Sequence, residues 1–89
     1  MKLKGERPKG RVFKTMRYHA GEWVVFTTWS SGGLQEWIGR IVVAGFLACD
    51  VVVFDAGKER IMPIQVTSII AVIPAETALA MLEVQGRLM

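Results

Sequence analysis

Short apolar runs alternate with polar and turn-forming residues between positions 21 and 74. This pattern is typical of β-strands a few residues long. Five such strands within about fifty residues predict a mainly β fold, a small closed or nearly closed barrel. The predicted strands are Glu22–Trp29, Glu36–Ala44, Cys49–Asp55, Glu59–Met62 and Ile69–Ile73.

Turn and strand-breaking residues separate these strands. Ser30–Gly33 reads as a flexible loop, Ala56–Lys58 as a turn between two strands, and Val66–Ser68 as a single tight turn. Pro63 has no backbone N–H to donate, so it is expected to end the fourth strand. Gly39 inside a strand indicates a sharp bend or a close backbone approach.

The alternation also predicts which side chains fill the barrel. A shift of one residue in any strand would exchange its two faces. The predicted core consists of Val24, Phe26, Ile41, Val43, Val51, Val53, Ile61 and Ile69.

After Pro74 the pattern becomes helical. Residues 75–85 are rich in strong helix formers, Glu76 suits the N-terminal end of the helix dipole, and Gly86 is placed to stop the helix. The helix is expected to pack on the open end of the barrel or on another subunit. Its predicted apolar side consists of Ala78, Met81, Leu82 and Gln85, widened by Leu79.

Charge is concentrated at the N-terminus. Residues 1–17 hold seven basic residues and one acidic residue, a balance of +6, whereas residues 18–89 hold four basic and seven acidic residues, a balance of −3. We therefore divide the chain into a basic arm (1–20), a barrel (21–74) and a C-terminal helix (75–89). The arm either tracks phosphates or is a solvated terminus, and residues 12–18 form either a strand or a helical turn. Its basic residues are Lys2, Lys4, Arg7, Lys9, Arg11, Lys14 and Arg17.

The high apolar content predicts exposed apolar surface. Hydrophobic residues make up 52% of an 89-residue chain, more than a core of this size can bury. We therefore expect a homo-oligomer or a protein partner. No membrane insertion is expected, because the longest apolar stretch, 41–54, is interrupted by Asp50 and is too short to span a bilayer. The lack of an apolar leader and the single Cys49 favour the cytoplasm.

The motifs of residues 21–73 resemble those of the SH3-like small-barrel superfamily. GEWV begins at Gly21, WIGRI at Trp37 and VVFDAG at Val52, and these elements look most like those of Tudor-type domains. Sm-like RNA-binding barrels are second in similarity, through IAVIP from Ile70 to Pro74. The chain departs from Sm proteins at Phe46–Leu47, where they carry an Asp.

The Tudor resemblance implies an aromatic cage for a methylated cation. Its walls would be Trp29, Trp37 and Phe54, but the fourth wall falls at the non-aromatic Ala56 and a cation, Lys58, lies nearby. The alternative is that Trp37 and Phe54 are core or subunit-contact residues.

Aromatic and arginine side chains on adjacent strands also fit a nucleic-acid surface, in which bases stack on rings and cations hold phosphates. The residues that fit this description are Trp23, Trp29, Arg40 and Arg60. We therefore expect a binding module that contacts nucleic acid, and the alternative is a protein-interaction or self-assembling structural module.

Catalytic and cofactor motifs are nearly absent. With one His and one Cys, His19 and Cys49, the chain cannot supply three or four His/Cys zinc ligands. The WIGRIV segment also resembles the plasmid-borne SH3-like dihydrofolate reductases. Their V-Q-I-Y-P strand corresponds to residues 59–63, where Arg60 and Met62 replace the Gln and Tyr that would hold the ligands. We expect no enzyme activity and no cofactor.

Overall fold

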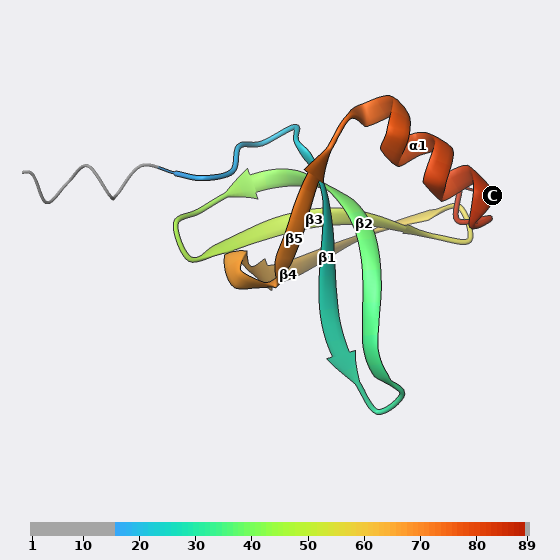
Figure 1. Cartoon of the computed structure of the whole chain (residues 1–89), viewed down its shortest axis with the longest axis horizontal. Helices are drawn as coiled ribbons and strands as arrows, with labels where there is room; N and C mark the ends of the chain where they lie inside the picture. The colour runs from blue at the N-terminus through green and yellow to red at the C-terminus, as the bar shows by residue number, and fades with distance from the viewer. Residues whose placement is uncertain (1–15, 89) are drawn as a thin grey trace, which may run out of the picture.

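The computed structural model describes residues 16–88 and is mainly β, as predicted (Figure 1). Its strands form one antiparallel sheet in the order β4-β3-β2-β1-β5. Within the described residues β4 and β5 form the two edges and do not pair with each other, so the sheet is open. The elements are β1 (Trp23–Ser30), β2 (Gly33–Ala44), β3 (Ala48–Asp55), β4 (Lys58–Gln65), the 3-10 helix η2 (Val66–Ser68), β5 (Ile69–Ile73) and α1 (Ala75–Val84).

Two tight hairpins build most of the sheet. Only Ser31 and Gly32 separate β1 from β2, so β2 starts three residues before its predicted beginning. Ala56 and Gly57 connect β3 to β4, and both have positive φ, 53° and 81°. Two consecutive positive φ values are typical of a turn whose twist matches that of the flanking strands.

The predicted end of β4 at Met62 is wrong. The strand continues through Pro63, which pairs with Asp50 of β3, and ends at Gln65. Proline is tolerated here because β4 is an edge strand, where a missing N–H on the outer side breaks no ladder hydrogen bond. The prediction rested on the missing N–H alone.

The main core lies on one face of the sheet, called the inner face below. Five of its predicted members, Val24, Phe26, Ile41, Val51 and Val53, have no solvent exposure. Trp37 also belongs to this core, in agreement with the alternative to the cage given above. The sequence pattern missed Cys49 and Ile64. The half-buried Tyr18, Ala44, Met62 and Val66 pack against this core beside the predicted Ile69.

Two predicted core residues are exposed, and the prediction was wrong for both. The β2–β3 register shifts between Ile41 and Val43, and this irregularity turns Val43 outward, leaving 57% of it exposed. Ile61 is 61% exposed because its neighbours Met62 and Ile64, and not Ile61, face the core. Both errors are shifts of one residue in strand register.

The opposite face of the sheet, the outer face, is covered by α1. Ala78 and Leu82 of the helix pack on Ile38 of β2, and all three are buried. Trp23, Val25, Phe54 and Ile73 surround this contact. The helix therefore packs on the outer face of its own sheet, which differs from both predicted arrangements, the open end of a barrel and another subunit.

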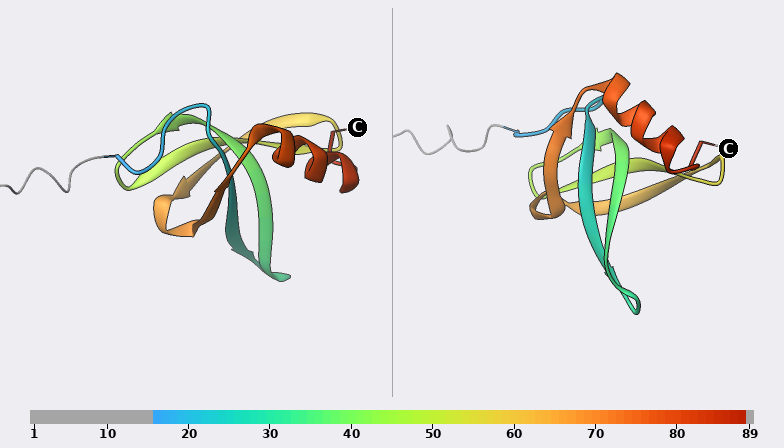
Figure 2. Two further views of the ribbon diagram at one scale, coloured as in Figure 1. Left: turned by 45° about the horizontal axis from the view of Figure 1, so that its top comes forward. Right: turned by 45° about the vertical axis from the view of Figure 1, so that its right-hand side comes forward.

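A C-terminal cap ends α1 where the sequence predicted a stop. Gly86 has φ +73° and donates its N–H to Glu83 O at 3.0 Å, while Arg87 N–H reaches Leu82 O at 3.0 Å. These two bonds form a Schellman motif. The next contact joins this turn to the sheet, because Gly57 N–H donates to Arg87 O at 3.0 Å. In both views of Figure 2 the end of the helix lies beside the β3–β4 turn.

Candidate functional site

The predicted basic arm falls largely outside the described residues. Lys2, Lys4, Arg7, Lys9, Arg11 and Lys14 all lie there. Arg17 is described: it is exposed, and its Cζ atom lies 5.9 Å from the ring centroid of Tyr18. Tyr18 in turn packs against the inner core, so Arg17 lies beside an anchored residue.

The N-terminal segment joins the sheet through a fixed backbone turn. Gly21 N–H donates to Ile41 O at 2.7 Å, and Ile41 N–H donates to Glu22 O at 2.9 Å. The carboxylate of Glu22 accepts a bond from His19 N–H at 2.6 Å. The positive φ of Gly21, +95°, explains why a glycine stands at this entry. These bonds place the N-terminal segment directly beside the residue that precedes Ile41.

That residue is Arg40, whose side chain lies on the outer face. Its Cζ atom is 6.0 Å from the ring centroid of Trp23, its cross-strand partner. Trp23 stacks on Phe54 with centroids 6.2 Å apart and planes 20° apart. Among residues 16–88 no carboxylate lies within salt-bridge distance of the Arg40 guanidinium. Arg40 is half-buried.

Two arginines flank Trp37 on the inner face. The Cζ atoms of Arg60 and Arg87 lie 5.7 Å and 4.8 Å from its ring centroid. Trp37 is only 8% exposed, and its Nε1–H donates to Thr28 Oγ1 at 2.9 Å. The ring is therefore a core residue with two guanidinium groups against it, and too little of it is exposed for a base to stack on.

Sequence reasoning missed Arg87 at this site. The Gly86 stop predicted that the chain turns after the helix, but the approach of that turn to the β3–β4 hairpin depends on contacts between distant segments. No local pattern in residues 75–89 carries that information.

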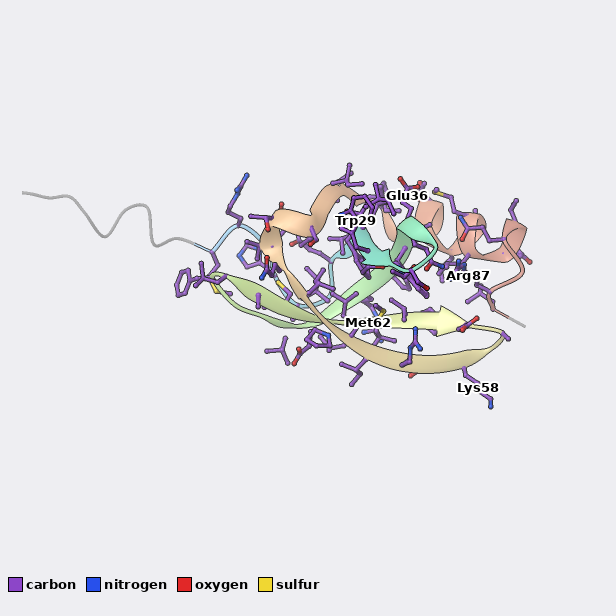
Figure 3. All side chains as sticks on the ribbon, turned by 90° about the horizontal axis from the view of Figure 1, so that it is seen from below. Trp29, Glu36, Lys58, Met62 and Arg87 are labelled. Carbon is purple, nitrogen blue, oxygen red and sulfur yellow. The ribbon has the colours of Figure 1, made fainter. Side chains whose placement is uncertain are left out.

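Trp29 is the one predicted aromatic whose ring is widely open to solvent. It is 80% exposed and pairs with the exposed Leu34 near the tip of the β1–β2 hairpin. Figure 3 labels Trp29 among the side chains of the described residues. The three suggested cage walls do not converge. Trp37 lies on the inner face, Phe54 packs on the outer face, and Trp29 lies at the hairpin tip. The structure thus brings Arg40 to Trp23 and Phe54, and Arg60 to Trp37, as two separate clusters.

Other kinds of site are not formed by the described part of the chain. No three His, Cys, Asp or Glu side chains between residues 16 and 88 gather as metal ligands. No helix in the same part is long and apolar enough to cross a membrane. Comparisons with family models, curated proteins and solved structures find no match to this chain.

Proposed function

We propose that this chain is a non-enzymatic nucleic-acid-binding module that contacts phosphates through residues 2–17 and Arg40. The observation that carries the proposal is the hydrogen-bonded turn of Gly21 and Glu22 on Ile41. It joins the most basic part of the chain to the sheet beside Arg40, which has no carboxylate partner among residues 16–88.

Electrostatics supports this choice of ligand. The N-terminal seventeen residues carry a balance of +6 and the remainder a balance of −3, so a polyanion is attracted to one end of the chain. Each phosphate neutralised by Lys or Arg releases condensed counterions, which favours binding at low salt. The exposed ring of Trp29 offers a surface on which an unpaired base can stack. We therefore take single-stranded nucleic acid as the first ligand to test.

The proposal includes the SH3-like barrel form that the sequence motifs resemble. β5 returns to pair with β1, and η2 alone separates β4 from β5. The two edge strands of the sheet are thus connected along the chain by η2 alone. Pairing of β4 with β5 would close the sheet into a barrel.

A titration tests the role of Arg40. Full-length protein is added to a labelled single-stranded oligonucleotide, and fluorescence anisotropy gives the affinity at several salt concentrations. Arg40→Gln should weaken binding and reduce the salt slope by about 0.7, the value for one phosphate on a single strand that is no longer neutralised. Arg40→Lys keeps the charge and should bind nearly as tightly as the wild type.

A charge-matched control separates electrostatic from sequence-specific binding by the arm. Residues 1–11 rearranged in order, with composition unchanged, should bind as well as the natural arm, because counterion release depends on charge and not on order. Equal affinities and salt slopes for the wild type and Arg40→Gln would contradict the assignment of Arg40.

A second candidate function is supported by the β2–β3 loop. Phe46 and Leu47 of this loop are 57% and 81% exposed, and Val43 near the end of β2 is 57% exposed. Exposed apolar side chains in one segment are typical of a protein-interaction surface. We propose self-association through this loop as the alternative. Salt separates the two functions, because phosphate binding weakens steeply as salt rises and an apolar interface does not.

A further inference from the structure

Two positively charged side chains share one aromatic ring. Arg60 comes from β4 and Arg87 from the turn after α1, and both guanidinium groups lie within 5.7 Å of the centroid of Trp37. Their Cζ atoms are therefore no more than about 10.5 Å apart, the sum of the two ring distances. Two positive charges within this range of each other attract an anion to the region between them.

Backbone contacts hold both arginines in place. Arg60 is paired with Val53 across the β3–β4 hairpin, and Val53 is paired with Gly39, two residues from Trp37. Arg87 is positioned by the Schellman motif and by its carbonyl bond from Gly57 N–H. The guanidinium groups of two segments far apart in the sequence thus lie against the same ring, and the bond from Gly57 to Arg87 links the β3–β4 hairpin to the C-terminal turn.

The hydrogen-bonding capacity of both groups is largely unused. Within residues 16–88 neither guanidinium donates to an oxygen atom, and the Arg60 side chain makes only a 4.0 Å contact from Nη2 to the sulfur of Met62. No carboxylate in the same residues comes within salt-bridge distance of either arginine. Each guanidinium has five N–H donors. Arg60 is exposed and Arg87 half-buried, so these donors can be reached from solvent.

We propose that Arg60 and Arg87 together bind a phosphate group beside Trp37. Guanidinium forks bind phosphate oxygens in a bidentate manner, and a phosphate presents acceptors in several directions, whereas one fork already satisfies a carboxylate. The assignment of this phosphate to a nucleic-acid backbone rests on the proposed function. The site itself lies apart from Arg40, on the other face of the sheet.

The three tryptophans provide matched reporters for this site. Their indole N–H signals are followed by ¹H–¹⁵N NMR while inorganic phosphate is added to the full chain, with sodium chloride of equal ionic strength as the comparison. Two arginine guanidinium groups lie over the ring of Trp37 and one lies over Trp23, whereas no arginine among the described residues lies over Trp29. We expect a saturable shift of the Trp37 signal with phosphate alone, and none for Trp29. A Trp37 signal that moves equally with chloride, or not at all, would overturn the site.

Substitutions identify the groups that bind. Arg60→Gln and Arg87→Gln should each weaken the phosphate affinity by about tenfold or more, the effect of removing a charge-assisted hydrogen bond. Arg40→Gln, which removes the single arginine over Trp23, should leave the Trp37 titration unchanged. Because Arg87→Gln can loosen the C-terminal turn, Arg60→Gln at the exposed edge strand is the decisive variant. Unchanged phosphate affinity in Arg60→Gln would contradict the paired site.

A single-stranded oligonucleotide, added in place of phosphate, identifies the source of the phosphate group. If the Trp37 signal shifts at a lower concentration of oligonucleotide than of inorganic phosphate, the bound group is a phosphate of the nucleic-acid backbone. Binding seen by anisotropy without movement of Trp37 would overturn this assignment and leave the proposed function intact. A Trp37 shift with phosphate and no binding of the oligonucleotide would contradict the proposed function and support a site for small phosphates.

Discussion

Gly39 in β2 and Val53 in β3 form the last pair of residues that joins these two strands. Beyond this pair the β1–β2 and β3–β4 hairpins diverge, as Figure 1 shows. The next two residues of β2 toward the β1–β2 turn, Ile38 and Trp37, have their side chains on opposite faces of the sheet. Ile38 packs against α1, whereas the guanidinium groups of Arg60 and Arg87 lie against the ring of Trp37. The point of divergence therefore sets the positions of both the helix and the arginine cluster.

The close approach at Gly39 gives the first prediction. A Cβ atom at this position would lie 2.7 Å from the carbonyl oxygen of Val52 and would also meet Cγ1 of Val51. Because a backbone oxygen in a paired strand cannot move aside, Gly39→Ala should lower the free energy of unfolding by about 1–3 kcal/mol. Chemical denaturation measures this decrease.

Gly32→Ala is the matched control for that change. Its new Cβ would lie 3.7 Å from the hydroxyl of Ser30, an ordinary contact. The free energy of unfolding should then change by no more than about 0.5 kcal/mol. Equal effects of the two substitutions would mean that β2 and β3 do not approach closely at Gly39.

The register shift in β2 gives the second prediction. Ile41 has no solvent exposure and Val43 is 57% exposed, although the sequence alternation assigns both to the core. Ile41→Ala should cost about 2–5 kcal/mol in free energy of unfolding, because it leaves a cavity. Val43→Ala should cost about 0.5 kcal/mol or less, as expected for a surface position. A larger decrease for Val43→Ala than for Ile41→Ala in denaturant titrations would show that Val43, and not Ile41, is buried in the core.

Local patterns predicted most of this fold. The strand positions, the turn at residues 66–68, the final strand and the Gly86 stop depend on alternation, turn chemistry and capping, all of which act over a few neighbouring residues. The path of β4 through Pro63 and the outward turn of Val43 depend on which strands are neighbours in the sheet. The alternation of apolar and polar residues does not determine the order of the strands.

The candidate site was predictable in its residue types and less so in its grouping. Arg40 lies beside Trp23, a residue of the predicted group, whereas Arg60 lies on the other face of the sheet beside Trp37, which the sequence analysis assigned to a cage or to the core. Arg87 reaches Trp37 only because the helix folds back over the sheet. Pairing of an arginine with a particular ring is set by tertiary contacts, and so it required the structure.

The third prediction concerns self-association. We predict that the chain self-associates through the exposed side chains of Phe46 and Leu47. Light scattering at micromolar concentration should give a mass well above the 9.9 kDa of one chain. Replacing both residues by Ser should lower that mass without unfolding the protein, because neither side chain is buried. A single 9.9 kDa species for the wild type would refute the expectation.

The salt dependence of nucleic-acid binding tests the proposed function most directly. Deleting residues 1–11 removes five basic residues and one acidic residue, a change of −4 in net charge. The truncated chain should bind a single-stranded oligonucleotide more weakly than the full chain. The slope of log affinity against log salt concentration should fall in magnitude by about 0.7 for each phosphate that the truncated chain no longer neutralises. If the full-length chain shows no binding at low salt, or if truncation leaves the slope unchanged, the proposed function is contradicted.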